Sequence, residues 1–225
     1  MTTREPDPTW TSVDRYIESR LVRSDAALDA AVEASSAGGL PSIAVAPNQG
    51  KLLGLWARAL HARNVLEIGT LGGYSTIWLA RALPADGKVI TLELERKHAD
   101  IAQANFVRAG VADRIELRLG RALDTLPQLA AEHRGPFDFV FIDADKSAIP
   151  EYFAWALKLT RSGSVIVVDN VVRKGALIDP ESTDPNVIGV RRLHEIVAAE
   201  PRVSATTVQT VGSKGYDGFA FILVN

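Results

Sequence analysis

Residues 65–75 read Val-Leu-Glu-Ile-Gly-Thr-Leu-Gly-Gly-Tyr-Ser and carry the strongest structural signal of the chain. The first four residues are typical of a buried strand, and the glycines after them predict a tight turn. Apolar residues at helical spacing, among them Ile77 and Leu83, predict a helix that starts near Tyr74. A strand, a glycine turn and a helix N-terminus together form a place where backbone can approach a nucleotide-like ligand closely.

The class of ligand is indicated by Glu67, which lies two positions before the first glycine of the turn. A dinucleotide places its pyrophosphate at such a helix N-terminus, and a carboxylate there would repel that anion. S-adenosylmethionine has a sulfonium and an ammonium group and no phosphate, so it suits an acidic strand end better. The glycine spacing, Gly69 and then Gly72 and Gly73, also departs from G-x-G-x-x-G. The alternative interpretation is a glycine turn of an ordinary α/β domain.

Strands and helices alternate along the rest of the chain. The predicted strands are 65–68, 88–93, 115–119, 137–142 and 165–168, followed by a hairpin of 204–210 and 218–224. This order predicts an α/β fold with a doubly wound, Rossmann-like sheet of seven strands, mostly parallel with an antiparallel C-terminal hairpin strand, and helices on both faces. We expect residues 1–42 to form a flexible tail and two accessory helices, the second starting at Ser24 and Asp25. These helices cap a site, make a dimer contact or cover one sheet face, and residues 43–225 form the ligand-binding domain.

Length and composition exclude several classes of protein. The 225 residues suffice for one large α/β domain and are too few for two typical ones. Lys+Arg 25 against Asp+Glu 27 gives no basic excess, so neither a nucleic acid nor an anionic membrane is the expected partner. The chain has no cysteine, which excludes disulfides and thiolate chemistry. The polar residues 1–8 lack an apolar signal core, and no apolar run is long enough to span a bilayer, so we expect a cytoplasmic protein.

Acidic and amide side chains gather at the ends of four predicted strands: Glu67, Glu93, Asp143 and the pair Asp169-Asn170. In an open α/β sheet, ligands bind beyond the carboxyl ends of the strands, where the strand order reverses. A single acid at a strand end is commonly a helix N-cap, but four such ends are harder to explain by capping alone. Glu93 lies at the distance from the glycine turn where a carboxylate accepts the hydroxyls of a ribose, in nicotinamide and S-adenosylmethionine sites alike. The alternative interpretation of Glu93 is a solvated charge on the protein surface.

Asp143, Asp169 and Asn170 offer three oxygen ligands on strand ends that we expect to be neighbours. Oxygen ligands without Cys or His suit Mg²⁺ or Ca²⁺ rather than zinc. Two helix caps and a turn asparagine are the alternative interpretation. Lys146 follows Asp143 by about one helical turn, and a nearby metal with partial burial would make it a proton acceptor.

These residues resemble the metal-dependent, class I S-adenosylmethionine O-methyltransferases of the caffeoyl-CoA and catechol type, in particular their bacterial small-molecule members. The resemblance covers residues 43–224 and is most specific in Asp143-Ala144-Asp145-Lys146 combined with Asp169-Asn170. It implies the same doubly wound fold, with residues 43–225 as the methyltransferase domain. It also implies that the protein forms a homodimer.

The resemblance assigns a role to each matching residue. The residues that it places at S-adenosylmethionine are Val45, Glu67, Gly69, Thr70, Ser75, Glu93, Ala122, Asp143 and Asp145. It identifies Asp143, Asp169 and Asn170 as ligands of a divalent cation, with Mg²⁺ as the expected ion. Lys146, beside Asp143, is implied to be the general base.

The implied reaction is methyl transfer to a hydroxyl of a small aromatic substrate with vicinal hydroxyls or of hydroxyanthranilate type. Arg173 and Lys174 occupy positions where the family often has Trp-Asn at the substrate mouth, and two cations there indicate an acidic substrate. Two rival functions stay open at this point. One is a nicotinamide-dependent oxidoreductase, which Glu93 allows and Glu67 opposes. The other is a non-catalytic protein that binds S-adenosylmethionine.

Overall fold

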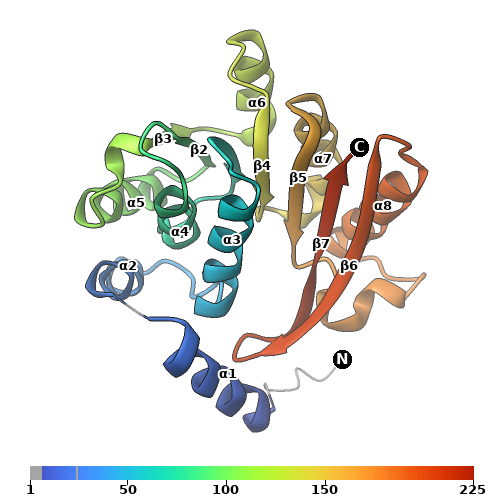
Figure 1. Ribbon diagram of the computed structural model, residues 1–225. Helices are drawn as coiled ribbons and strands as arrows, with labels where there is room; N and C mark the ends of the chain where they lie inside the picture. The colour runs from blue at the N-terminus through green and yellow to red at the C-terminus, as the bar shows by residue number, and fades with distance from the viewer. Residues whose placement is uncertain (1–6, 24) are drawn as a thin grey trace.

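The computed structural model describes residues 7–23 and 25–225, and they form one seven-stranded sheet with the strand order β3-β2-β1-β4-β5-β7-β6 (Figure 1). The strands are β1 (Asn64–Ile68), β2 (Lys88–Glu93), β3 (Ile115–Leu119), β4 (Phe137–Ile142), β5 (Thr160–Asp169), β6 (Val203–Gly212) and β7 (Gly215–Val224). Strands β3, β2, β1, β4 and β5 pair in parallel, and β7 is antiparallel to both β5 and β6. The predicted fold, a mostly parallel sheet with an antiparallel strand in the C-terminal hairpin, is therefore confirmed.

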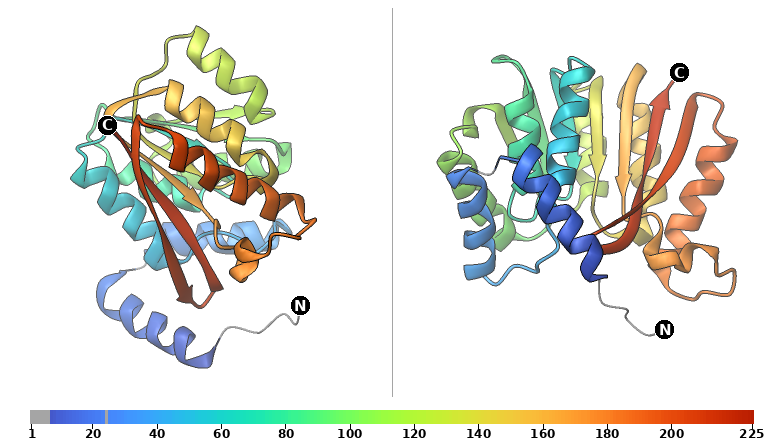
Figure 2. Two further views of the ribbon diagram at one scale, coloured as in Figure 1. Left: turned by 90° about the vertical axis from the view of Figure 1, so that its right-hand side faces the viewer. Right: turned by 60° about the horizontal axis from the view of Figure 1, so that its bottom comes forward.

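Helices cover both faces of the sheet (Figure 2). One face packs against α2 (Ala26–Ala37), α3 (Pro47–Ala59), α4 (Tyr74–Ala82) and α5 (Arg96–Arg108). The other packs against α6 (Ala122–Ala131), α7 (Ile149–Lys158) and α8 (Pro185–Ala199). Successive strand residues point to opposite faces, so Val65 joins the first core cluster while Leu66 and Ile68 join the second. Because both faces are buried, the central strands are continuous apolar runs.

The N-terminal helices differ in how they attach to this core. In α2, Leu28 and Ala31 are buried among the side chains of α3, α4 and α5. In α1 (Pro8–Leu21) no residue is buried, and Asp14 ties the helix to the body by accepting hydrogen bonds from the Ser213 N–H at 2.7 Å and the Asn48 amide at 3.3 Å. Of the tail expected at residues 1–8, residues 1–6 lie outside the described residues, as does Ser24 of the expected helix start. Pro8 already belongs to α1 and Asp7 caps it, so the tail ends earlier than expected. A domain boundary at residue 42 stays a prediction.

Two segments differ from their predicted structure. Strand β5 begins at Thr160 rather than at Val165, because its polar first half still pairs with β4 through Thr160 and Phe137, with a register shift before Val165. The segment 171–186 after β5 is rich in Gly, Pro and Asp and is expected to be a loop, but it contains a short helix, η3 (Arg173–Ile178), which is interrupted by left-handed backbone at Lys174 and Gly175. The first half of β5 was not predicted because its residues are polar. The helix η3 was not predicted because its segment is rich in glycine and proline.

Strand β1 lies between β2 and β4, so the strand order reverses at β1 and β4. Ligands of doubly wound sheets bind beyond the carboxyl ends of the strands at such a point. This topology places Ile68 and Ile142, the last residues of paired strands, at the base of the expected site. None of the helices in the described part of the chain is both long and apolar enough to span a membrane.

Candidate active site

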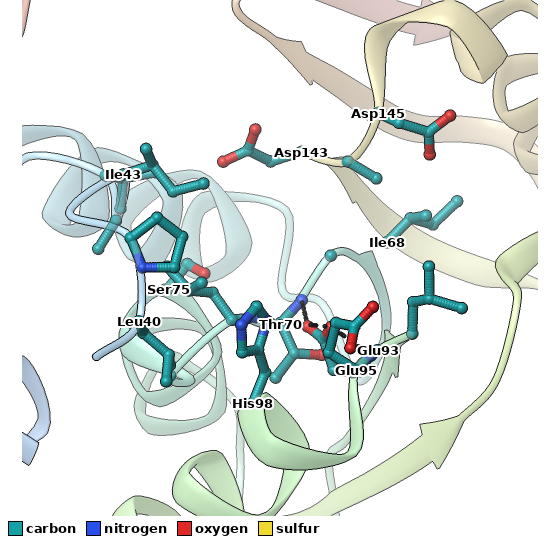
Figure 3. A pocket seen from close by; sticks show the side chains of 18 of the residues that line it. Leu40, Ile43, Ile68, Thr70, Ser75, Glu93, Glu95, His98, Asp143 and Asp145 are labelled. Carbon is teal, nitrogen blue, oxygen red and sulfur yellow. Dashed lines mark hydrogen bonds and ion pairs between the residues drawn. The ribbon is translucent and has the colours of Figure 1, made fainter. Parts of the chain in front are cut away.

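A cavity of about 1090 Å³ lies at the carboxyl ends of the strands. Its walls come from α2, from the segment between α2 and α3, from the turns after β1, β2, β3 and β4, and from single residues of later segments. Such a volume exceeds what a drug-sized ligand needs, and so accommodates a nucleoside-sized cofactor together with a small aromatic substrate. In the view of Figure 3, Asp143 and Asp145 lie on one side of the cavity, and Glu93 and His98 lie on the other.

The glycine turn after β1 brings two strand ends into contact. Gly69 has a φ of 101°, and a Cβ there would lie 2.1 Å from the backbone oxygen of Asp143 at the end of β4. Gly73 has a φ of 81°, and its Cβ would collide with the ring of Phe106. Both positions therefore require glycine, because they combine left-handed backbone with a close approach. Gly69, Thr70 and Ser75 line the cavity.

Glu67 does not line the cavity but lies fully buried beneath the glycine turn. Its carboxylate accepts hydrogen bonds from the hydroxyls of Ser75 and Thr91, each at 2.6 Å, and from the hydroxyl of Thr76. Burial raises the pKa of the Glu67 carboxyl to about 7 despite these donors. In this position the side chain holds the first turn of α4, and its expected role at S-adenosylmethionine stays a prediction.

Glu93 lines the cavity and at the same time fixes the backbone of the glycine turn. Its Oε2 accepts hydrogen bonds from the backbone N–H groups of Thr70 at 3.2 Å and Leu71 at 2.7 Å (Figure 3). Its Oε1 accepts from the Glu95 N–H at 2.9 Å and lies 3.4 Å from His98 Nδ1. A carboxylate offers about four acceptor positions, so these contacts orient the group for ribose hydroxyls without filling it.

The remaining expected cofactor residues, Val45, Ala122 and Asp145, also line the cavity. Sequence reasoning missed Tyr152 of α7, which lines the same wall and donates its hydroxyl hydrogen to Asp145. Burial raises the pKa of the Tyr152 hydroxyl, so it stays a donor at neutral pH. The signal available was its position in the first turn of the helix that follows Asp145.

A cluster of charged and polar groups lies where β4 and β5 end, around the carboxylates of Asp143 and Asp169. Lys146 is almost fully buried, and its Nζ lies 2.7 Å from Asp143 Oδ1. Asp169 is buried and accepts hydrogen bonds from Gln49 Nε2 at 2.7 Å and from the Asn170 N–H at 2.8 Å. Burial, and then the charge of Asp143, raise the pKa of Asp169. Sequence reasoning missed Gln49, which comes from α3.

The structure brings Asn170 to this end of the cavity as well, but it separates the two cations expected at the substrate mouth. Asn170 lines the cavity with a left-handed φ of 56°. Arg173 also lines the cavity, whereas Lys174 is exposed and does not contribute to the wall. Among residues 7–23 and 25–225, no three His, Cys, Asp or Glu side chains converge on one point. A cation site here would therefore need the Asn170 amide beside Asp143 and Asp169.

Known proteins with similar sequences cover nearly the whole chain. A family model described as O-methyltransferase matches residues 19–219. A catechol O-methyltransferase of Niastella koreensis is 52% identical over 95% of this chain and 96% of that protein. A catechol O-methyltransferase of Mycobacterium tuberculosis is 53% identical over 98% of each chain.

Solved structures that resemble this chain are also O-methyltransferases. An O-methyltransferase from Bacillus cereus in complex with SAH (S-adenosylhomocysteine) has a TM-score of 0.95 and 57% identity, over 96% of this chain and 99% of that one. The O-methyltransferase TomG from Streptomyces achromogenes, involved in tomaymycin synthesis and solved with SAM, has a TM-score of 0.95 and 54% identity over the full length of both chains. These likenesses exclude the oxidoreductase and the non-catalytic interpretations. The chain belongs to the O-methyltransferase family, and it is an S-adenosylmethionine-dependent O-methyltransferase.

Proposed function

We propose that this enzyme methylates one hydroxyl of a catechol-like aromatic substrate, with vicinal hydroxyls or of hydroxyanthranilate type, and that it needs a divalent cation, with Mg²⁺ as the expected ion. The observation that carries the proposal is that Asp143, Lys146 and Asn170 line one end of the cavity, with Asp169 buried directly behind them and close enough to Asp143 and Lys146 for their charges to act on it. The catechol O-methyltransferases that are 52% and 53% identical support the substrate class.

The residues at this end fit a hard divalent cation. Their donors are two carboxylates and one amide, which are the oxygen ligands that Mg²⁺ and Ca²⁺ prefer. Asp143 disfavours ionisation of the buried Asp169, and a cation between them would remove that conflict. When bound, such a cation supplies Lewis-acid chemistry, because its charge lowers the pKa of a substrate hydroxyl beside it.

Lys146 is the proposed proton acceptor. It lines the cavity beside Asp143, and the 2.7 Å contact between its Nζ and the Asp143 carboxylate holds the amine in one position. A lysine amine held beside the reacting hydroxyl can serve as a general base when it is uncharged. The proton of the reacting hydroxyl would pass to Nζ as the oxygen attacks the methyl group.

The other end of the cavity is proposed to hold the methyl donor. Gly69, Thr70 and Ser75 would surround the methionine part, and Glu93 would accept the ribose hydroxyls. Val45 and Ala122 supply apolar wall, with Ala122 beside the adenine and Asp145 at its border. Holding donor and acceptor in one cavity at near-attack distance supplies much of the rate, with effective molarities of about 10⁵ M or more.

A pair of isomeric substrates tests this proposal. Catechol and resorcinol carry the same two hydroxyls, but only catechol places them on neighbouring carbons. We expect formation of S-adenosylhomocysteine in the presence of Mg²⁺ to be faster with catechol by about tenfold or more, because only vicinal oxygens chelate one ion. Equal rates for the two isomers would refute recognition of a vicinal pair.

We further propose that the enzyme is a homodimer and that helix α1 lies in the contact. Tyr16 and Leu21 are 65% and 62% exposed, and Val13 is 50% exposed, although apolar side chains of this size are usually buried when a helix has a partner. Light scattering of the purified protein tests this, and a monomeric mass at micromolar concentration would refute it. The cytoplasmic location and the absence of nucleic-acid and membrane partners stay predictions.

A further inference from the structure

The basic side chains of the cavity differ in whether they have a partner. Lys146 pairs with Asp143, His98 lies 3.4 Å from Glu93, and Lys214 reaches only a backbone oxygen, that of Ser42 at 3.5 Å. Arg121 lies 3.9 Å from Asp124. The guanidinium of Arg173 has neither a hydrogen bond nor an ion pair within residues 7–23 and 25–225.

The Nε atom of Arg173 is moreover buried without a hydrogen-bond partner. Such an orphaned donor of a charged group is costly, so native proteins rarely leave one without a use. Two other side-chain atoms in the described part of the chain share this condition, Trp78 Nε1 and Arg114 Nε, and neither residue lines the cavity. Of these three residues, Arg173 alone lines the cavity, where a ligand could bind the terminal amino groups of its guanidinium.

The backbone around Arg173 is held in an unfavourable conformation. Asn170, Arg173 and Lys174 have φ values of 56°, 55° and 55°, in the left-handed region that non-glycine residues seldom adopt. Asp217 fixes the loop, because its Oδ1 accepts hydrogen bonds from the N–H groups of Val172 at 3.0 Å and Arg173 at 2.9 Å. Strain that the surrounding structure enforces in this way is a common feature of ligand-binding sites. The Asp217 carboxylate, which comes from β7, thus binds the backbone of this loop and makes no ion pair with the Arg173 guanidinium.

The position of Arg173 relates it to the substrate rather than to the methyl donor. It follows Asn170 by three residues in the same loop, and Asn170 lies at the end of the cavity that contains Asp143 and Lys146. Lys214, at the tip of the β6–β7 hairpin, adds a second positive charge to this wall. A planar guanidinium binds a carboxylate through two parallel hydrogen bonds.

We propose that Arg173 binds a carboxylate on the aromatic ring of the substrate and so selects acidic catechol-like compounds over neutral ones. This inference rests on the proposed function, which places the reacting hydroxyl near Asp143 and Lys146. Arg173 is a specificity-determining residue in this account, and Lys174, which is exposed outside the cavity, has no part in it.

Two substrates of the same shape test the inference. 3,4-Dihydroxybenzoate and 3,4-dihydroxybenzamide share the ring and both hydroxyls, and they differ in the charge of one planar group. We expect Arg173→Gln to lower kcat/KM for the acid by about tenfold or more and to leave the amide within about twofold of the wild type. Lys174→Gln removes the same charge one residue away, and we expect both substrates to stay within about twofold. Equal changes for acid and amide in Arg173→Gln would overturn the inference.

Binding separates this inference from the proposed reaction. Calorimetric titration of 3,4-dihydroxybenzoate into protein saturated with S-adenosylhomocysteine and Mg²⁺ needs no turnover. If the wild type methylates neither compound but binds the acid about tenfold more tightly than Arg173→Gln does, the reaction is wrong and the carboxylate site stands. If the wild type methylates both compounds and Arg173→Gln binds the acid as tightly as the wild type does, the carboxylate site is wrong and the reaction stands. An unchanged melting temperature in Arg173→Gln, with S-adenosylhomocysteine bound, verifies that the variant folds.

Discussion

The carboxylates at the two ends of the cavity differ in the donors and charges that surround them. At the glycine turn, Glu67 meets three hydroxyls and Glu93 meets three backbone N–H groups. At the ends of β4 and β5, Asp143 and Asp169 lie close enough for the charge of Asp143 to raise the pKa of Asp169, and Lys146 opposes this effect together with the hydrogen bonds from Gln49 and the Asn170 N–H. Donors of the folded protein thus hold both carboxylates in place at the first end, whereas at the second end the proposed cation would balance the negative charge.

The contrast predicts that the carboxylates at one end shape the cofactor site and that those at the other end take part in the reaction. Carboxylates that are satisfied by the fold hold the turn in shape, so their effects on activity act through cofactor affinity and stability. Under the proposed function, the carboxylates at the ends of β4 and β5 would act on the reacting groups, so their effects should appear in turnover. Substitutions at the two ends should therefore fall into two classes with different readouts.

The largest effect is expected at Asp169. Replacing Asp169 by Ala should lower kcat by about 10³-fold or more, because the cation would lose a ligand and the substrate its activation. The affinity for S-adenosylhomocysteine should stay within about twofold, as measured by calorimetry. Asp100→Ala removes an exposed carboxylate on α5 and serves as the control, with activity expected to be unchanged. Loss of S-adenosylhomocysteine binding in Asp169→Ala would assign Asp169 to the cofactor end and break the contrast.

Lys146→Ala should lower kcat by about 10²-fold or more, the range that a general base contributes. The affinity for Mg²⁺, measured by the concentration that restores half of the activity, should change by only a few-fold. If the Mg²⁺ requirement changed as much as kcat, Lys146 would shape the cation site instead of accepting a proton.

At the glycine turn the expected effect is on stability. Gly69→Ala places a Cβ against the backbone of Asp143, and we expect it to lower the free energy of unfolding by about 3 kcal/mol or more. Gly110 also has a positive φ, of 66°, but nothing lies near its added Cβ, so Gly110→Ala should cost about 1 kcal/mol. Urea denaturation measures both values. Similar losses in the two variants would show that the close approach between β1 and β4 contributes nothing.

The smallest expected effect is the pH dependence of stability caused by Glu67. The folded protein holds this proton up to a pKa of about 7, while the unfolded chain releases it near 4.5, so the folded form loses stability as pH rises between these values. Relative to Glu67→Gln, which cannot titrate, the wild type should lose at most about 3 kcal/mol from pH 5 to pH 8. Urea denaturation in EDTA at both pH values tests this. Parallel curves for the two proteins would mean that Glu67 is ionised throughout.

Much of the fold could be predicted because local patterns determine it. The apolar run at 137–142 and the segment 88–93 became β4 and β2 with the predicted bounds, since buried parallel strands need continuous apolar sequence. The first half of β5 could not be predicted, because Arg161, Ser162 and Gly163 have none of the features of a buried strand. Its pairing depends on β4, which is remote in the sequence.

The candidate site, like the fold, could be predicted from the sequence only in part. The residues at strand ends meet as expected because parallel strands place their carboxyl ends at one edge. Glu67 was assigned to the cavity from its place in the motif, but strand alternation puts it on the same face as Val65, with Thr91 of β2 as its neighbour. Gln49 could not be found from the sequence, because 120 residues separate it from Asp169.

The central claim is that one end of the cavity binds the methyl donor unaided and the other end works through a divalent cation. Methyl transfer to catechol, followed as S-adenosylhomocysteine in Mg²⁺ and then in EDTA, tests it most directly when cofactor binding is measured in the same two solutions. We predict that EDTA abolishes turnover, that added Mg²⁺ restores it, and that cofactor affinity stays within about twofold. Turnover that continues in EDTA would contradict the account and leave Asp143, Asp169 and Asn170 with a structural role alone.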